Sequence, residues 1–389
     1  MKTRALGIPA AARRVLRPLA AEAAKEGAEL YAVGGCVRDW LLGIASQDLD
    51  LVVKGDPAPV AGLCAEMFGG KPQAFDRFGT LRVLGPDRWR VDFATSRREA
   101  YPKPASLPVV KPAPLRADVF RRDFTINAMA VRLHPDREGE LLDYCGGLKD
   151  LRAKIVRPLH RESFRDDPTR VFRAARFLCR FGFKPAPGML PMVKEALKRG
   201  YAALLSRHRL TQELLRVLGE KDPACALNLL RDWGYLRLIH PKLHAPPREL
   251  RLVEERLGAL ALALGPAEGA KFLGSLPVER GLALELQEVL KLAWGQASPR
   301  RRLSALSRRL LRCKFPRLAS GALEPLYLNG DDLKAAGVPV GKGFSEIMDA
   351  AAKAQWSGEI SSRGDALRWL RGRQAPISSA AGVRRPSPS

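Results

Sequence analysis

The chain of 389 residues carries 66 lysines and arginines against 41 aspartates and glutamates, a formal net charge of +25 at pH 7, and 46% of its residues are hydrophobic. This length is compatible with two to four domains, and this composition with sizeable hydrophobic cores. A positive charge of that size repels itself unless a polyanion is close by, and it is spread along the chain. A general bias toward arginine is one explanation; a nucleic-acid partner explains the magnitude better.

No segment is apolar enough over about 18 residues to span a membrane. Arginines interrupt the apolar residues near the N-terminus, which favours an amphipathic helix over a secretory signal and makes the cytoplasm the expected location. The five histidines are dispersed, which argues against a metal phosphohydrolase built on His and Asp. The cysteines show neither a CxxC pair nor zinc-ligand spacing, so reduced, mostly buried thiols are expected. They are Cys36, Cys64, Cys145, Cys179, Cys225 and Cys313.

The N-terminal part of the chain alternates strand and helix signals. Residues 28–43 predict a strand, a Gly-Gly turn and a helix, and "DLDLVV" at 48–53 predicts a strand that begins with two acids. Residues 80–95 predict a hairpin around the turn "GPDR", and 127–147 a further pair of strands. Between them, the proline-rich segment 99–120 predicts a mobile loop without regular structure. Beyond this part, apolar residues recur with helical spacing, and the chain ends in a Pro, Ser and Gly-rich stretch.

The acids of "DLDLVV" are the first candidate site. Carboxylates two residues apart on a strand lie on the same face, so Asp48 and Asp50 should converge at the start of their strand. Mg²⁺ binds one or two carboxylates together with substrate phosphates, which makes this pair the predicted metal site. The hairpin strand adds Asp92 as a third candidate catalytic acid. Taken alone, acids at this spacing are usually solvated surface charge.

The Gly-Gly turn is the second candidate. Gly34 and Gly35 have no side chains, so the backbone there can approach a phosphate and donate N–H groups to it. Arg38 follows on the helix and offers two parallel donors to a triphosphate. A Gly-Gly pair alone indicates only a turn. The ordered combination of strand, Gly-Gly, Val-Arg-Asp helix and Asp-x-Asp strand is far more specific.

Two later motifs combine apolar periodicity with charge. In "RRDFTINAMA" at 121–130, the alternating apolar side chains are expected to pack against a sheet. The polar side chains between them fit either a functional site or the exposed end of a surface strand. In "DDPTRVFRAARF" at 166–177, proline suits the first turn of a helix and an aspartate its cap. Arg170, Arg173 and Arg176 recur three apart along one helical face, which is most often a solvated stripe. Asp167 lies one turn before Arg170, and together they offer an acceptor and a planar donor to a base edge.

These three motifs, in this order, resemble the signatures of class II tRNA nucleotidyltransferases and bacterial poly(A) polymerases, within the polymerase β-like superfamily. The resemblance covers roughly residues 28–240, and "LNGDDLKAAGVPVGKGF" resembles the tail of bacterial CCA-adding members. It implies an α+β fold, in which a polymerase β-like head with a small mixed sheet is followed by an all-α neck, body and tail. The implied reaction is template-independent addition of C, C and A to the 3′ end of tRNA from CTP and ATP with Mg²⁺.

The resemblance also implies domain boundaries. We expect a catalytic head at 1–147, a helical neck with the nucleotide-base-reading helix at 148–240, a tRNA-binding body and tail at 241–372, and a disordered end at 373–389. The oligomeric state is not specified by the sequence.

Site roles follow from motif positions. Asp48 and Asp50 would hold Mg²⁺, and Asp92 is our candidate for an acid near the attacking hydroxyl. Asp167 and Arg170 would read the base edge. The resemblance and the Gly-Gly argument together give the nucleotide-binding set Gly34, Gly35, Arg38, Arg122, Asp123, Asn127, Asp167, Arg170, Arg173 and Arg176.

The match departs from the family pattern at one position and leaves several functions open. The base-reading motif begins Asp166-Asp167, where the family commonly has Glu-Asp. The proline-rich loop after Tyr101 matches the place of a flexible loop needed for the switch from C to A. Remaining alternatives are a CC-adding or A-adding sibling, a poly(A) polymerase, a small-molecule nucleotidyltransferase and a catalytically idle RNA-binding module.

Overall fold

The computed structural model describes residues 6–74 and 79–374. From position 375 onward, the predicted disordered end lies outside the described residues. The chain divides into two compact units, each described here by itself. The first unit consists of residues 1–213 and 225–238, and the second of residues 214–224 and 239–389.

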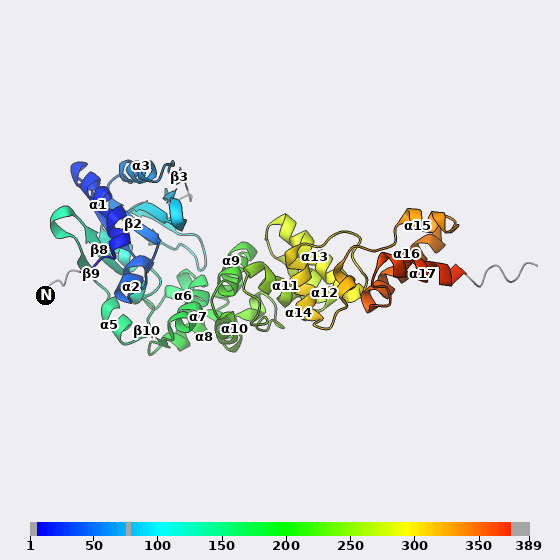
Figure 1. The fold of residues 1–389 in the computed structure, drawn as a ribbon. Helices are drawn as coiled ribbons and strands as arrows, with labels where there is room; N and C mark the ends of the chain where they lie inside the picture. Colours follow the sequence, from blue (N-terminus) through cyan, green and yellow to red (C-terminus); the bar gives the residue numbers. More distant parts are fainter. Residues whose placement is uncertain (1–5, 75–78, 375–389) are drawn as a thin grey trace, which may run out of the picture. The chain divides into compact units, whose positions relative to one another are not determined.

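A seven-stranded mixed sheet forms the first part of unit one (Figure 1). Its strands follow the order β3–β4–β5–β2–β1–β8–β9. β2 and β5 run parallel, whereas β1 pairs antiparallel with both β2 and β8. The bounds are β1 (Glu29–Val33), β2 (Asp48–Lys54), β3 (Gln73–Ala74), β4 (Leu81–Leu84), β5 (Arg90–Thr95), β8 (Met129–Leu133) and β9 (Glu140–Asp143). The predicted mixed sheet, the β4–β5 hairpin and the β8–β9 pair are confirmed.

The alternation within the strands builds the core that supports the acids. Tyr31, Val33 and Val52 pack in one cluster with Leu115 and Val119 of α4 (Leu115–Phe120), all at most 7% exposed. Side chains two apart on a strand share a face, so the acidic start of β2 lies on the same face as Val52. The acids therefore extend from a strand whose other end is fixed in the core.

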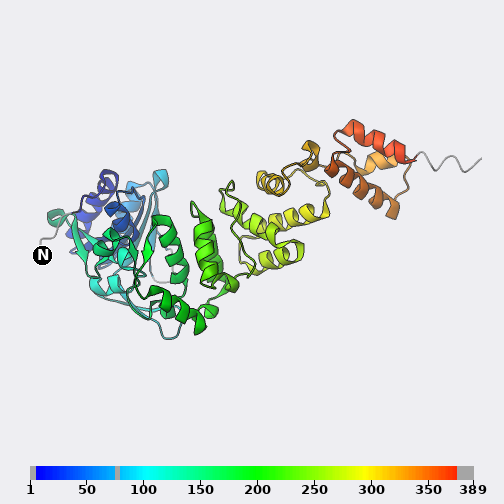
Figure 2. The same ribbon diagram turned by 90° about the horizontal axis from the view of Figure 1, so that it is seen from below.

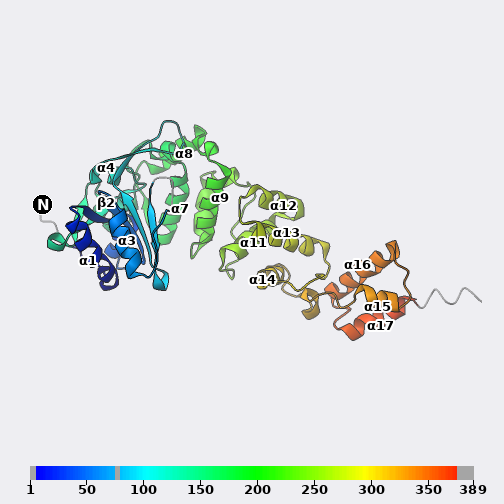
Figure 3. The ribbon, with the colours of Figure 1, turned by 90° about the horizontal axis from the view of Figure 1, so that it is seen from above.

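Three helices complete this α+β head. α1 (Ala10–Lys25) contacts β1 and β8 and lies beside α3 (Ala58–Met67), as Figure 3 shows. α1 is amphipathic as predicted, burying Leu16 and Leu19. α2 (Gly35–Leu41) follows β1 directly and contacts β1, β2 and β8. The predicted order of strand, Gly-Gly turn, helix and acidic strand is thus confirmed.

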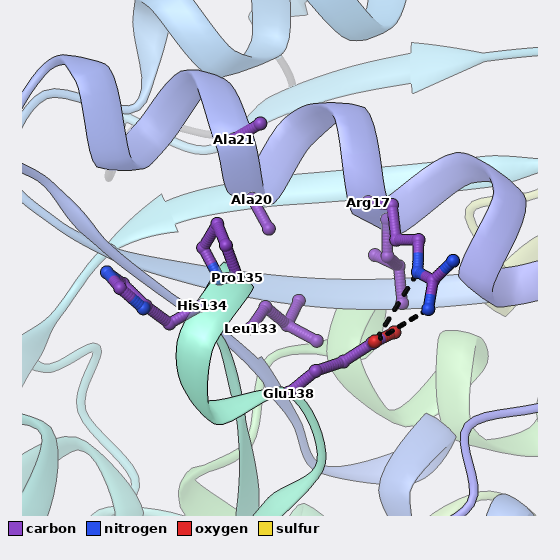
Figure 4. Close-up of a pocket in the computed structure, with 8 residues that line it drawn as sticks. Arg17, Ala20, Ala21, Leu133, His134, Pro135 and Glu138 are labelled. Carbon is purple, nitrogen blue, oxygen red and sulfur yellow. Dashed lines mark hydrogen bonds and ion pairs between the residues drawn. The ribbon is translucent and has the colours of Figure 1, made fainter.

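A small cavity of about 260 Å³ lies between α1 and the turn η3 (Pro135–Arg137) that joins β8 to β9 (Figure 4). Arg17 donates to Glu138 at its edge, with Nη2 3.2 Å from Oε2. Apolar side chains such as Leu16 and Leu133 form its walls. None of the predicted site residues lines this cavity.

The proline-rich segment contains more regular structure than predicted. β6 (Arg97–Ala100) and β7 (Val109–Pro112) form an antiparallel hairpin, and α4 follows immediately. The prolines lie in the connection, at the end of β7 and before α4, where a missing N–H is tolerated. The expectation of a loop without regular structure was therefore wrong at both ends of the segment.

Helices dominate the rest of unit one, as predicted. A short parallel pair, β10 (Ile155–Val156) with β11 (Lys184–Pro185), brackets α7. The other bounds are η2 (Thr125–Asn127), α5 (Gly147–Arg152), α6 (Ser163–Asp166), α7 (Thr169–Phe181), α8 (Met189–Lys198), η4 (Tyr201–Leu204) and η5 (Leu236–Leu238). α9 (Arg207–Leu218) begins in unit one and ends in unit two, and α10 (Pro223–Asp232) has its first two residues in unit two.

Two cysteines form a disulfide, contrary to the expectation of reduced thiols. Cys179 of α7 is bonded to Cys225 of α10, 46 positions later. The sequence offered no pairing signal, because the two thiols meet only once α10 packs against α7. Cys36 and Cys64 are free and buried, as expected.

The second unit is helical. Around Leu328, Leu333 and Ala351, the last three helices share one core, visible in orange to red in Figure 2. No helix in the described ranges is long and apolar enough to cross a membrane. The bounds are α11 (Val253–Leu264), α12 (Pro266–Ser275), α13 (Arg280–Gly295), α14 (Ala305–Lys314), η6 (Ser320–Leu323), α15 (Gly330–Ala335), α16 (Lys342–Ser357) and α17 (Arg363–Gln374).

Candidate active site

The acids of β2 stand together at one face of the sheet. β2 alternates exposed Asp48 and Asp50 with buried Leu49 and Leu51. The parallel register of β2 and β5 sets Asp50 directly opposite Asp92. Asp92 also alternates with buried neighbours, so all three carboxylates project from the same face at adjoining positions.

Arginines already neutralise two of these acids. Arg90, the cross-strand neighbour of Asp48, places Nη2 3.0 Å from Asp48 Oδ2. Arg82 of β4 donates from Nε and Nη2 to the two oxygens of Asp92, each at 2.7 Å. Bidentate pairs of this kind are stronger than exposed single contacts. Asp48 is therefore the more easily recruited acid, and Asp92 the more firmly held.

Asp50 differs electrostatically from its neighbours. Protein atoms crowd its carboxylate although the residue keeps solvent contact, and this partial desolvation raises the pKa of Asp50 above 3.8. The positive charge of Arg122 opposes the shift, whereas the negative charges of Asp92 and Asp48 add to it. A cation placed here would relieve both the repulsion and the poor solvation.

The donor set suits a hard divalent cation. Asp48 and Asp50 offer carboxylate oxygens on one face, and such ions take one or two carboxylates with substrate oxygens completing the shell. Within the described ranges, no three His, Cys, Asp or Glu side chains converge closely enough to hold an ion without further ligands. The bidentate pair with Arg82 keeps Asp92 out of such a set. The geometry fits a two-carboxylate site completed by a ligand.

Gly34 makes room for an arginine beside Asp50. It links β1 to α2 with φ +75°, a conformation that favours glycine. A Cβ at this position would lie 2.5 Å from Arg122 Nη1 and 3.6 Å from Asp50 Oδ2. The Arg122 guanidinium therefore occupies the space beside the acid that the missing side chain leaves. For Gly35, the corresponding Cβ would lie 3.6 Å from Arg38 Nη2, an ordinary contact.

A buried acid that the sequence analysis missed orients Arg122. Asp118 is fully buried and accepts from Arg122 Nη2 at 3.0 Å and from Arg121 Nε at 2.9 Å. Burial alone would raise the pKa of Asp118, but the two guanidinium groups outweigh it and hold the pKa below 3.8. Asp118 is thus a charged anchor for both arginines of "RRDF". Its helical spacing to them, three and four residues, was the available signal.

A chain of polar contacts connects the Gly-Gly turn to α7. Arg38 Nη1 donates to Asn127 Oδ1, and Asn127 Nδ2 donates to Asp123 Oδ1 at 3.0 Å. Asp123 in turn accepts from Arg173 Nε at 2.7 Å. Burial acts to raise the pKa of Asp123, but Arg173 and the amide of Asn127 prevail and lower it below 3.8. Four of the predicted positions therefore form one connected network.

Aromatic rings of α7 enclose the start of this network. The Arg38 guanidinium carbon lies 5.3 Å from the Phe177 ring centroid and 4.8 Å from that of Phe181. Arg38 is only 4% exposed, so cation–π contact and hydrogen bonds replace its water. Arg176 directly precedes Phe177 in sequence and is half-buried. The apolar side of α7 thus helps to fix a cation of the head.

Asp167 and Arg170, the predicted base-reading pair, have separate partners. Arg170 is 5% exposed and donates to Ser163 Oγ and to the Arg121 carbonyl oxygen, both at 2.8 Å. Asp167 caps α7 by accepting from Thr169 N at 3.0 Å. The structure places both residues at the start of α7 and assigns each of them protein contacts.

Arg209 of α9 is a second residue that the sequence analysis missed. Its Nη2 lies 2.6 Å from Asp167 Oδ1, and its Nη1 donates to the Ala105 carbonyl oxygen at 2.8 Å. Ala105 also donates its N–H to the Arg165 carbonyl oxygen at 3.0 Å. Arg209 therefore links the proline-rich connection to the start of α7, where the predicted base-reading pair lies. No local pattern indicated this contact, because α9 begins about forty positions after Asp167.

Comparisons with known proteins agree with this geometry. The family model described as "Poly A polymerase head domain" matches residues 30–157, which include β2, β5 and all of β1 except its first residue. The CC-adding tRNA nucleotidyltransferase of Deinococcus radiodurans is 34% identical over 348 residues, covering 88% of this chain and 89% of that protein. The chain belongs to the class II tRNA nucleotidyltransferase family.

Other family members match over different lengths. The A-adding tRNA nucleotidyltransferase of Geobacter sulfurreducens is 35% identical over 416 residues, which cover 92% of this chain but 47% of the relative. The chain thus spans about half the length of that tRNA nucleotidyltransferase. A solved structure described as a CCA-adding enzyme in its apo form II aligns with a TM-score of 0.70 at 26% identity, covering 94% of this chain and 96% of that one.

Proposed function

We propose that this protein adds nucleotides to the 3′ end of tRNA without a template, using CTP and ATP to build C, C and A and releasing pyrophosphate. The observation that carries the proposal is the exposed Asp48–Asp50 pair on β2 with Arg122 held beside Asp50 by Gly34 and Asp118. This arrangement combines metal-binding oxygens and a fixed cation on the face of a family head domain.

In this proposal, Asp48 and Asp50 hold Mg²⁺, which when bound lowers the pKa of the attacking ribose hydroxyl and neutralises triphosphate charge. Arg122, held beside Asp50, would contact the phosphates. The Gly34–Gly35 backbone allows the triphosphate to approach α2. Asp92, held by Arg82, is a neighbouring carboxylate that orients the hydroxyl. Catalysis then consists of positioning and electrostatic stabilisation.

The second network would serve the nucleotide itself. Arg38, Asn127 and Asp123 connect the turn to Arg173 on α7, so sugar and phosphate contacts on the head are rigidly related to the base-reading helix. Arg176 continues the same face of α7. Asp167 and Arg170 would each exchange one protein partner for the base edge. In unit two, the basic helices would bind the tRNA body.

Two sibling functions deserve direct comparison, because similar relatives bear the names A-adding and CC-adding. The test uses tRNA transcripts that end before the CCA sequence or after its second C. Each is incubated with CTP alone, ATP alone or both, and products are resolved at single-nucleotide length. CCA addition requires CC from CTP alone on the first transcript and CCA from both nucleotides.

Other outcomes separate the rivals. Addition only of A to the longer transcript identifies an A-adding enzyme. Addition to the shorter transcript that stops after CC when both CTP and ATP are present identifies a CC-adding enzyme. A long ladder from ATP identifies a poly(A) polymerase. No product from any transcript, by a folded protein that binds tRNA, would reject the enzymatic proposal in favour of an idle RNA-binding module.

A further inference from the structure

A large cavity lies in unit one apart from the acids of β2. It measures about 890 Å³ and is lined by residues of the segments 157–165 and 186–201. None of its lining residues is among the predicted site positions. Pockets for small organic ligands commonly have volumes of about 300–1,000 Å³. The cavity, here called the neck cavity, is therefore large enough for a ligand of mononucleotide size.

Positive charge exceeds negative charge around the neck cavity. Its two lining acids are already paired, since Arg165 Nη1 lies 3.5 Å from Glu162 Oε2 and Arg199 Nε lies 2.6 Å from Glu195 Oε1. Arg161 has no ion pair or hydrogen bond to any described residue and is exposed. The lining thus contains four arginines against two glutamates: Arg157, Arg161, Arg165, Arg199, Glu162 and Glu195. Arg157 is also paired, with Nε 2.9 Å from Asp150 Oδ2, so Arg161 is the lining arginine that can bind an anionic group without displacing an acid.

Apolar side chains form the floor of the neck cavity. Phe164 and Met189 are each 1% exposed and close it from the protein side. Pro187, Pro191 and Tyr201 add ring surfaces around them. Planar bases stack on aromatic and apolar rings, and arginine forks bind phosphates with two parallel hydrogen bonds. Inorganic phosphate would use only the arginines and leave this floor uncovered.

We propose that the neck cavity is a second ribonucleotide-binding site, distinct from the nucleotide site at the acids of β2. The phosphate lies against Arg161 and competes with Glu195 for Arg199, and the base lies over the Tyr201 side of the floor. This inference does not rest on the proposed catalytic function. The ligand is either a free nucleoside 5′-phosphate or one nucleotide of an RNA strand, because both present the same base and phosphate.

The test is photo-crosslinking of the full-length protein with 8-azidoadenosine 5′-monophosphate, followed by peptide mapping. We expect labelled peptides from 157–165 or 186–201. The double variant Arg161→Glu/Arg199→Glu should reduce this labelling about tenfold or more, because charge-assisted contacts are lost. The matched control Arg152→Glu/Lys184→Glu reverses two exposed cations outside the lining and should label like the original protein. Circular dichroism melting confirms that both variants fold.

Competition identifies the source of the nucleotide. Protection by AMP but not by a single-stranded RNA hexamer supports a free-nucleotide site, and protection by the hexamer supports an RNA-strand site. Equal protection by inorganic phosphate, absence of label from both segments, or unchanged labelling of the double variant would each overturn the proposal. The Asp50→Ala variant should label the neck cavity normally, so failure of the catalytic proposal and failure of this one give different results.

Discussion

In the proposed mechanism, Asp50 is the residue on which nucleotide addition most depends. It shares a face with Asp48 and lies beside Arg122, so replacement by alanine removes one of two proposed metal ligands. We predict that Asp50→Ala lowers nucleotide addition by about a hundredfold or more while the Kd for tRNA stays nearly unchanged. The measurements are primer extension of tRNA and filter binding. Asp136→Asn, at a side chain that is 86% exposed, is the matched control. Normal turnover by Asp50→Ala would remove the metal-site assignment.

The raised pKa of Asp50 also predicts a pH effect on stability. An acid whose pKa is higher in the folded than in the unfolded protein lowers the free energy of unfolding once it is ionised in both states. This loss is absent below pH 3.8 and complete above the raised folded-state pKa. We therefore expect Asp50→Asn to raise Tm at pH 7, with the difference shrinking as pH falls toward 3.8. A Tm unchanged or lowered at pH 7 would show that the attraction to Arg122 outweighs the cost of desolvation.

Asp167 has two possible roles that one experiment separates. A carboxylate accepts from the exocyclic amine that C and A both carry and that U and G lack at that position. If Asp167 reads the base, Asp167→Ala should lower kcat/KM for CTP and ATP about tenfold or more relative to UTP. The measurement covers all four nucleoside triphosphates, with tRNA affinity as the control. Unchanged discrimination would mean that Asp167 only caps α7 and holds Arg209.

At the scale of elements, the disulfide joins α7 to α10. The disulfide closes a loop of 46 residues and so lowers the entropy of the unfolded chain. This raises the free energy of unfolding by about 4 kcal/mol at 25 °C. We predict that dithiothreitol lowers the urea midpoint of unit one, and that Cys225→Ser gives the lowered midpoint with or without reductant. Cys313→Ser, at a free thiol, should retain the response. A midpoint insensitive to reductant in the original protein would contradict the presence of the bridge.

The elements that sequence patterns predicted are those governed by local periodicity. β2 could be placed because its acids alternate with Leu49 and Leu51, and α7 because its apolar residues recur with helical spacing. The hairpin β6–β7 escaped prediction because each of its strands has only four residues and the prolines in and beside the connection indicated a loop.

In the candidate site, too, the residues that could be predicted are those that local periodicity places. Asp48, Asp50 and Asp92 could be grouped from strand alternation and motif order. Asp118 could have been added from its helical spacing of three and four residues to Arg121 and Arg122, whereas Arg209 could not, because its partners are fixed by tertiary packing. The buried contacts of Arg170 were equally invisible, since a helical stripe of arginines predicts an exposed face rather than a bond to the Arg121 carbonyl oxygen.

For the whole molecule, the net charge of +25 predicts how tRNA binding responds to salt. Each phosphate contact releases condensed counterions, so affinity falls as a power of salt concentration. We expect log Kd to rise against log salt concentration with a slope of about 5 or more, as for six or more phosphate contacts. The slope is measured by fluorescence anisotropy of labelled tRNA between about 50 and 300 mM KCl, roughly the range in which such plots are linear. A slope near one would exclude a phosphate-dominated footprint.

The pairing of Asp48 with Arg90 and of Asp92 with Arg82 has a consequence for how the protein is made. These arginines serve as counter-ions built into the polypeptide, so assembly of the sheet does not wait for a metal. Chelation with EDTA should therefore leave Tm within about 1 °C, whereas proteins that fold around their metal melt when it is removed. Under the proposed function, a nascent chain would reach its final architecture in a metal-poor environment and bind the metal later, together with its nucleotide.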